Sequence, residues 1–569
     1  MHRWTTLQVL AAFAGALLIS VAGFPQASQT QSSVGRAQSQ GAGQANPAPP
    51  VVRVTTRMVQ VNVIVHDRDG KPVAGLTKGD FHILDEGEPQ TISFFAEQTT
   101  RLTVPAATQV STKVFSNHAE EQAGVPTSVT VILLDWLNTA QHSMAFARPQ
   151  VIKFLRTQIQ PQDRVALYGL SSKRLFNLHD FTNDSAALLR VLDRATQKKA
   201  ASPQGKGAAE PDSEDARLDQ FLAEADAHPR TVIVDQVGMT SNALKIIANR
   251  LANIPGRKNL VWVSSSFPSS VGYSYRMSMG TSAQGRFPPS LFNQQTTDAA
   301  RALSNANVAI YPVDARGLIP NPPFARYDLG SAFPPPEQFD TMIALARATG
   351  GRAFYNNNDI RGAIRRAIDD SRVTYVLGYY PTHNQWNGEF RNITVKTDRK
   401  GVEMRYRSGY FASPPAGAAD PNRQQQSLAD AITSPLESTE LDLDVEADPV
   451  DVPGARQLKT RIRVTPSEMH FEEKDGRWTD ALEVIWVELD KEGKITGTHT
   501  QTFRFRPTQE EYQALLRIPF DVSETVSVSE SAAEVRIVVS DTGSGAIGSV
   551  NIPLSRLFTP AAMQPATKQ

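Results

Sequence analysis

The stretch "VILLDWLNTA", residues 131–140, decides the fold. Four consecutive apolar residues lead directly into Asp135, and the hydrogen-bonding side chains of Asn138 and Thr139 follow just behind. A continuous apolar run without alternation is typical of a strand that is covered on both faces of its sheet. Two interpretations of Asp135 are open at this point. It is either a metal ligand, or a polar residue that accepts hydrogen bonds from the free N–H groups of the turn after the strand.

Three further continuous apolar runs follow along the chain, and helical patterns lie between them. Because strand and helix alternate, we expect an α/β fold with a doubly wound, mostly parallel sheet over residues 128–372. The segment "LFNLHDF" (175–181) closely follows the second run and is expected to be its antiparallel hairpin partner at the sheet edge. The further runs are "RVALYGL" (164–170), "NLVWVSS" (259–265) and "VAIYPVD" (308–314).

Antiparallel strands are predicted on both sides of this α/β segment. Residues 51–98 alternate between apolar and polar side chains and are interrupted by turn residues at 67–70 and 85–87. Shorter strands resume over residues 373–411. Each set is too small to be stable alone, since small strand sets need more partners or a covering layer. We therefore predict that the two sets pair across the α/β segment into one antiparallel β-sandwich.

The remainder of the chain divides by composition. Residues 428–558 contain strand patterns with the spacing of a second β-sandwich. Polar and proline-rich stretches lie between the predicted domains. We therefore expect linkers at 101–127 and 412–427, and a tail at 559–569.

The first residues predict export. Residues 1–24 combine a short basic start, an apolar run from Leu7 and the small-x-small pattern Ser20-Val21-Ala22, which is typical of a signal peptide. An uncleaved anchor is the alternative, because the run approaches the about 20 residues that span a bilayer. Residues 25–50 contain few large apolar side chains and are predicted to be a disordered tether. We expect the periplasm, the cell surface or the medium as the destination, with no membrane span after cleavage.

Charge, cysteine content and motifs argue against several functional classes. Lys+Arg and Asp+Glu both number 58, and this balance argues against a nucleic-acid partner. The absence of cysteine excludes disulfides, thiolate zinc sites and a cysteine nucleophile. The glycine motif "GSGAIG" (543–548) lies between two predicted strands, so a hairpin turn is favoured over a nucleotide loop. None of the 10 histidines belongs to an H-E-x-x-H motif. We therefore expect no enzymatic activity.

The order of the elements resembles the von Willebrand factor A (VWA) fold: a strand that ends in Asp, a helix, a β-hairpin, and then alternating strands and helices. The flanking strands make this resemblance more specific. They are "VNVIVHDRDGKPVAGLTKGDFHILDEGEPQTISFF" (61–95) and "TYVLGYYP" (374–381). Together they resemble the secreted bacterial VWA-related proteins known chiefly as the acidobacterial VWFA-related family. The resemblance covers roughly residues 51–411, and the C-terminal sandwich lies outside it.

The resemblance implies a degenerate ion site. Many VWA domains bind Mg²⁺ through a D-x-S-x-S motif after the first strand, a threonine in a later loop and an aspartate after the fourth strand. Here Leu137 replaces the middle serine, and serines replace the later aspartate. A single carboxylate makes a weak Mg²⁺ site, so we expect no cofactor and keep Mg²⁺ as the alternative. The candidate ligands are Asp135, Asn138, Thr139 and Ser264.

Two long segments after the runs at 259–265 and 308–314 are the candidate binding surface. They follow the carboxyl ends of strands, where open α/β sheets bind ligands, and they carry aromatic and methionine side chains, which are enriched in recognition surfaces. The alternative is that these side chains fold back into small cores. The candidate ligand-binding residues are Tyr273, Tyr275, Met277, Phe287, Phe324 and Tyr327.

These observations together predict an exported, non-enzymatic binding or adhesion protein. Its VWA-like domain is expected to meet a protein or polysaccharide of the envelope or the exterior. Two alternatives stay open. One is a hydrolase or enzyme accessory that uses the serines at Ser264–Ser266. The other is a structural envelope component that assembles with itself.

Overall fold

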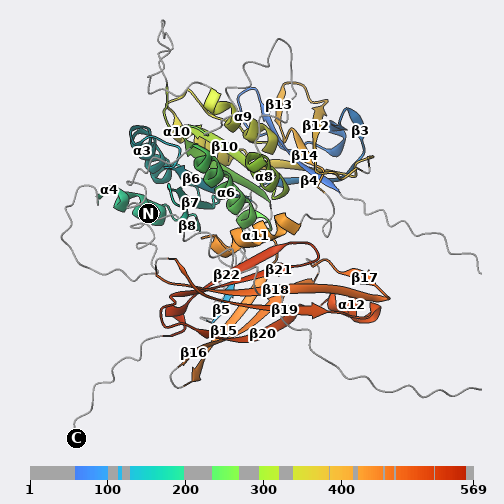
Figure 1. Cartoon of the computed structure of the whole chain (residues 1–569). Helices are drawn as coiled ribbons and strands as arrows, with labels where there is room; N and C mark the ends of the chain where they lie inside the picture. The colour runs from blue at the N-terminus through green and yellow to red at the C-terminus, as the bar shows by residue number, and fades with distance from the viewer. Residues whose placement is uncertain are drawn as a thin grey trace, which may run out of the picture. The chain divides into compact units, whose positions relative to one another are not determined.

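The computed structural model (Figure 1) describes most of the chain after residue 57, all within one compact unit that begins at residue 56. The predicted signal peptide and tether therefore lie outside the described residues. Within the described part, no helix has the length and apolar character needed to cross a membrane. The described ranges are 58–99, 113–117, 128–197, 233–254, 256–267, 294–318, 337–383, 385–413, 421–452, 455–466, 469–491, 493–517 and 519–558.

A five-stranded sheet with the order β10-β9-β6-β7-β8 forms the centre of the α/β domain (Figure 1). The first four of these strands run parallel, and β8 pairs antiparallel with β7 at the edge. This arrangement confirms the predicted α/β fold with a mostly parallel sheet. The strands are β6 (Ser128–Asp135), β7 (Val165–Leu170), β8 (Leu175–Thr182), β9 (Arg257–Ser264) and β10 (Val308–Asp314).

Helices cover both faces of this sheet. Val131 and Leu133 of β6 belong to a core that includes side chains of α6, α8 and α9. Ile132 and Leu134 point the other way, into a core with α3, α4 and α10. Alternate side chains of one strand therefore enter different cores, which is why the apolar run has no polar interruption. The helices are α3 (Gln141–Thr157), α4 (Ser185–Gln197), α6 (Ile233–Leu251), α8 (Gln294–Asn305), α9 (Glu337–Thr349) and α10 (Ile360–Asp369).

Strands from both sides of the α/β domain share two antiparallel sheets, with the orders β13-β1-β11-β4 and β14-β12-β2-β3. In the first sheet Val61 lies opposite Leu377, and in the second Ile83 lies opposite Val395. These four side chains belong to one core, because alternate residues of each strand face inward. The strands are β1 (Val59–Asp67), β2 (Phe81–Asp85), β3 (Glu88–Gln90), β4 (Ile92–Thr99), β11 (Val373–Tyr379), β12 (Phe390–Thr397), β13 (Val402–Arg405) and β14 (Gly409–Phe411).

The C-terminal part contains two further antiparallel sheets, with the orders β20-β16-β15-β5 and β17-β18-β21-β22, and β19 pairs with β18. Their side chains meet in a core that includes Val445 and Ile462 of one sheet and Trp486 and Ile537 of the other. The elements are β15 (Leu443–Val452), β16 (Ala455–Val464), β17 (Glu472–Lys474), β18 (Arg477–Leu489), β19 (Ile495–Phe505), α12 (Gln509–Leu515), β20 (Phe520–Val528), β21 (Glu534–Asp541) and β22 (Ile547–Pro553).

The two expected linkers contain ordered elements. Within 101–127, β5 (Val114–Ser116) pairs with β15 and places Phe115 in the C-terminal core. Asn117 then donates side-chain hydrogen bonds of 2.8 Å to the carbonyl oxygens of Ser438 and Leu441. Within 412–427, the helix α11 (Pro421–Thr433) begins. A three-residue strand is too short to show alternation, and so the sequence pattern did not reveal β5.

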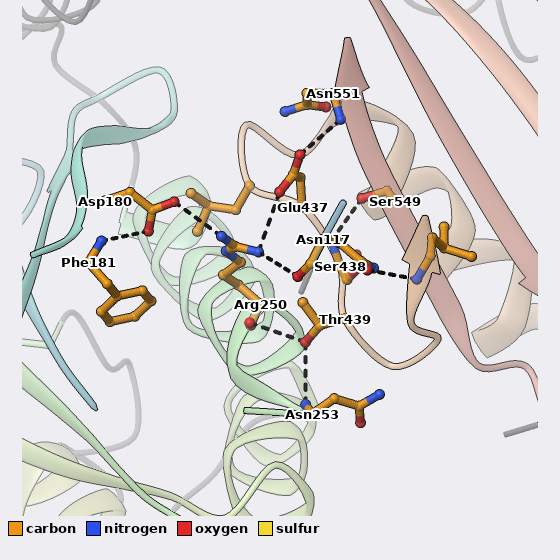
Figure 2. Close-up of polar contacts among 12 residues, drawn as sticks. Asn117, Asp180, Phe181, Arg250, Asn253, Glu437, Ser438, Thr439, Ser549 and Asn551 are labelled. Carbon is orange, nitrogen blue, oxygen red and sulfur yellow. Dashed lines mark hydrogen bonds and ion pairs between the residues drawn. The ribbon is translucent and has the colours of Figure 1, made fainter. Parts of the chain in front are cut away.

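A buried arginine joins the C-terminal end of α6 to the segment before β15 (Figure 2). The Arg250 side chain is 3.1 Å from Asp180 Oδ2 in β8 and 3.4 Å from Glu437 Oε2, and it donates to the Asn117 carbonyl oxygen. Only 3% of Arg250 is exposed. Thr439 Oγ1 lies 3.2 Å from the Arg250 carbonyl oxygen, and it satisfies one of the carbonyls that a helix end leaves free.

We predict that Arg250→Ala lowers the free energy of unfolding by about 3–5 kcal/mol, because it leaves the partly buried carboxylates of Glu437 and Asp180 without their cation. Urea unfolding followed by circular dichroism measures this. The exposed pair of Arg461 and Glu446, 3.1 Å apart, provides the control. Arg461→Ala should cost no more than about 1 kcal/mol. Equal losses in the two variants would contradict a structural role for the buried cluster.

A second prediction concerns two neighbouring carboxyl groups in the C-terminal sheets. Burial and a hydrogen bond with Asp541 raise the pKa of Asp480 from 3.8 to about 8. Between those values the folded chain holds a proton that the unfolded chain releases, so stability should fall as the pH rises from 4 through about 8 and level off above it. Denaturant unfolding at several pH values should show this slope, and Asp480→Asn should flatten it. A slope unchanged in the variant would refute the assignment.

Candidate functional site

Asp135 ends β6 and is completely buried. Its Oδ1 atom accepts a hydrogen bond from the Asn138 backbone N–H at 3.0 Å. Its Oδ2 atom accepts from Asn138 Nδ2 at 2.8 Å, from Ser264 Oγ at 2.8 Å and from Trp262 Nε1 at 2.9 Å. Both carboxylate oxygens are therefore occupied by donors from the following turn and from the neighbouring strand β9.

The other predicted ligands belong to the same cluster. Thr139 Oγ1 accepts a hydrogen bond from the Ser265 backbone N–H at 3.1 Å, which ties the turn after β6 to the end of β9. Asn138 Nδ2 also donates to Thr240 Oγ1 of α6 at 2.8 Å. The structure therefore brings Asp135, Asn138, Thr139 and Ser264 together at the carboxyl-end edge of the sheet.

Two members of the cluster were missed from the sequence. Trp262 appears in the sequence as one more residue of an apolar strand, yet its indole N–H is a direct partner of Asp135. Thr240 lies inside a helix, with no glycine-rich loop to mark it as the threonine of an ion site. For both residues the pairing depends on tertiary contact, which a local pattern does not encode.

Burial raises the pKa of the Asp135 carboxyl, and the hydrogen bonds from Asn138, Ser264 and Trp262 act in the opposite direction. The hydrogen bonds favour the ionised form because all of these groups are donors. The site is thus a buried carboxyl group whose hydrogen bonds all come from neutral donors.

A second carboxylate lies at the same edge. Asp314 ends β10 opposite Ser264, and it is almost fully buried. Both of its oxygens are held by the Arg316 side chain at 2.9 Å, in a bidentate pair. Its position at the end of an apolar strand was visible in the sequence, but its neutralising arginine is known only from the structure.

The residues present do not fit a bound Mg²⁺ ion in this arrangement. Mg²⁺ needs an octahedron of oxygens, usually with one or two carboxylates beside several waters. A cation at Asp135 would have to displace internal donors, and the carboxylate of Asp314 is already paired with Arg316. The nearby Asn138 Oδ1 and Ser265 Oγ are buried and have no hydrogen-bond partner among the described residues, but they are neutral oxygens. Among the described residues, no group of three His, Asp or Glu side chains is placed to hold a metal.

The predicted ligand-binding residues Tyr273, Tyr275, Met277, Phe287, Phe324 and Tyr327 lie outside the described residues. The elements that bracket them are described. One segment follows β9, and the other follows β10. Both therefore leave the carboxyl-end edge that contains Asp135.

The strand order, the antiparallel edge hairpin and the helices on both faces together decide the fold class. The α/β domain is von Willebrand factor A-like. No protein-family model and no curated protein matches the chain. Several solved structures are similar to part of the chain, and the three described below have TM-scores of 0.22 to 0.24.

Three of these structures illustrate the range of the similarity. An aerotolerance-related membrane protein from Bacteroides fragilis is 14% identical, with a TM-score of 0.24, and the match covers 43% of this chain and 98% of that one. The TFIIH p34 N-terminal domain is 16% identical, with a TM-score of 0.22 and coverage of 42% and 96%. The human COPII-coat protein Sec24c is 10% identical, with a TM-score of 0.22 and coverage of 50% and 43%.

We predict that millimolar Mg²⁺, Mn²⁺ or Ca²⁺ leaves the melting temperature of the protein nearly unchanged, because the Asp135 oxygens already have internal partners. Specific binding at 100 times Kd would instead stabilise the fold by about 2.7 kcal/mol. Thermal unfolding with each ion and with EDTA tests this. Asp135→Asn is the matched variant, since it removes the charge and keeps the size. A metal-dependent rise that this variant abolishes would show that Asp135 binds a cation.

Proposed function

We propose that this chain is an exported, non-enzymatic binding protein related to the secreted bacterial VWFA-related family. Its VWA-like domain engages a protein or polysaccharide of the cell envelope or the exterior without an intrinsic metal ion. The segments after β9 and β10, with Tyr273, Tyr275, Met277, Phe287, Phe324 and Tyr327, supply the contact surface. Residues 1–24 direct export.

One observation carries the metal-independent part of this proposal. The two carboxylates at the carboxyl-end edge, Asp135 and Asp314, are both saturated by donors of the chain itself. Cation-bridged recognition needs an exposed carboxylate, and these two are buried. Recognition at this edge therefore relies on direct polar and apolar contacts, for which aromatic and methionine side chains are suited.

The surroundings of the serines favour binding over hydrolysis. Ser264 is completely buried, and its hydroxyl donates to Asp135 and lies 3.0 Å from the Ser266 carbonyl oxygen. Ser265 Oγ is buried and has no hydrogen-bond partner within the part of the chain that the structure describes. A serine nucleophile requires a base within hydrogen-bond reach and access to the substrate. These contacts support the non-enzymatic proposal over a serine hydrolase.

The test measures binding of the mature chain, residues 25–569, to envelope fractions of the source organism by biolayer interferometry. Fractions are used untreated, after protease digestion, or after periodate oxidation of glycans, each with Mg²⁺ or with EDTA. We expect saturable binding that EDTA leaves unchanged and that one of the two treatments abolishes. The double variant Tyr273→Ala/Tyr275→Ala should bind at least about tenfold more weakly, which corresponds to about 1.4 kcal/mol.

The control variant is Tyr380→Ala, because Tyr380 is an exposed aromatic just after β11 of the first sandwich. It should bind like the unaltered chain. Loss of binding in EDTA would contradict metal-independent recognition. Turnover in a screen of esters, peptides and glycosides that disappears in Ser265→Ala would overturn the non-enzymatic proposal in favour of a hydrolase.

A further inference from the structure

A cleft of about 860 Å³ lies where α9, α10 and the loop between them meet β13 and the turn after β1. The cleft runs along the outer side of the edge strand β10. Phe354 pairs with Val313 near the carboxyl end of β10, whereas Ser371, just after α10, contacts Ser128 at the start of β6. None of the lining residues belongs to the cluster around Asp135. Its volume falls in the range of small-ligand sites, which is about 300–1,000 Å³.

The cleft carries a surplus of positive charge. Six of its lining side chains are cationic and three are acidic, whereas the whole chain has a formal net charge of +0. His66 adds little, because burial lowers its pKa. The cationic side chains are Lys71, Arg347, Arg352, Arg366, Arg372 and Arg405, and the acidic ones are Asp369, Asp370 and Glu403.

Two of the three acids are already neutralised by arginines within the fold. Arg405 holds both oxygens of Asp370, at 2.6 and 2.7 Å. Arg372 lies 2.7 Å from Asp369. These pairs are partly buried, and they reduce the contribution of Asp369 and Asp370 to the charge of the cleft.

Two exposed arginines are gathered on one aromatic ring. The guanidinium carbons of Arg352 and Arg366 lie 5.5 and 5.3 Å from the centre of the Phe354 ring. Cation–π contact holds them there. Arg366 has a carboxylate 3.7 Å away, that of Asp359, and neither Arg352 nor the Lys71 side chain has a carboxylate partner among the described residues. Both guanidinium groups therefore lie near the same ring, and an anion bound in the cleft is attracted by both.

The chemistry of these groups selects the ligand. Guanidinium groups form bidentate hydrogen bonds with carboxylates and phosphates, and the exposed side chains of Arg352 and Arg366 both line the cleft. Tyr355, which is 55% exposed, and Tyr406 also line the cleft. A sugar ring can pack its apolar C–H face against an exposed aromatic side chain while its hydroxyl groups bond to nearby polar groups.

We propose that this cleft binds an acidic oligosaccharide of the uronic acid type, with carboxylates on Arg352 and Arg366 and a sugar ring against Tyr355. None of the described lining residues belongs to the segments after β9 and β10, and the test below uses a different ligand and different variants from the test of the proposed function. Binding is driven largely by charge, and it weakens as salt rises because screening is strong at exposed groups.

Isothermal titration calorimetry of the mature chain with a linear triuronate at low ionic strength tests the proposal. We expect saturable one-to-one binding that weakens at least tenfold between low and physiological salt. Arg352→Ala/Arg366→Ala should weaken it at least tenfold, and Tyr355→Ala should weaken it while leaving the salt dependence intact. Both arginines are exposed, and circular dichroism should show unaltered folding.

Arg461→Ala is the matched control, since it removes an exposed arginine from the C-terminal part of the chain. It should bind like the unaltered protein. Absence of triuronate binding would overturn the proposal, as would equal binding of a neutral trisaccharide or an equal loss in the control. Tripolyphosphate or hexaglutamate binding more tightly than the triuronate would reassign the cleft to a phosphate or an acidic peptide.

Discussion

The carboxyl-end edge of the central sheet depends on the buried carboxylate of Asp135. Four donors converge on it, from the turn after β6 and from Trp262 and Ser264 of β9. A buried carboxylate is costly unless it is hydrogen-bonded, and a fully satisfied polar network rigidifies the structure around it. This acceptor therefore fixes the turn that leads into α3 and the strand end from which one candidate binding segment departs.

The same network satisfies the hydrogen-bonding capacity of the Asp135 carboxyl group with donors of the chain itself. Leu137 contributes no hydroxyl, and the end of β9 supplies serines in place of an aspartate. Serine hydroxyls and an indole N–H are donors, so they satisfy Asp135 directly, whereas a second carboxylate would repel it unless a cation lay between them. Leu137 and the serines at the end of β9 both differ from the ion-site pattern, and both differences favour direct hydrogen bonding to Asp135 over cation binding.

Much of the fold was predictable because its signals are local. The uninterrupted run of β6 predicts a strand buried on both faces, and its side chains do enter two cores. The brief strand β5 was not predictable, since Phe115 and Asn117 are recognised by residues more than 300 positions away. The residues around Asp135 also divide into those that local sequence predicts and those that only tertiary contacts bring together. Asp135, Asn138, Thr139 and Ser264 follow from position along strands, whereas Trp262, Thr240 and the bidentate partner of Asp314 depend on tertiary contact.

The carboxyl-end edge of the sheet and the cleft beside β10 differ in how their charged groups are paired. At the carboxyl-end edge, Asp135 and Asp314 each accept hydrogen bonds from donors within the fold. In the cleft, Asp369 and Asp370 pair with Arg372 and Arg405, whereas Arg352 on the Phe354 ring has no carboxylate partner among the described residues. Uncompensated charge in a cleft attracts ligands of opposite sign and speeds their association. Charge-driven recognition is therefore expected in the cleft beside β10, and recognition by shape and apolar contact at the carboxyl-end edge.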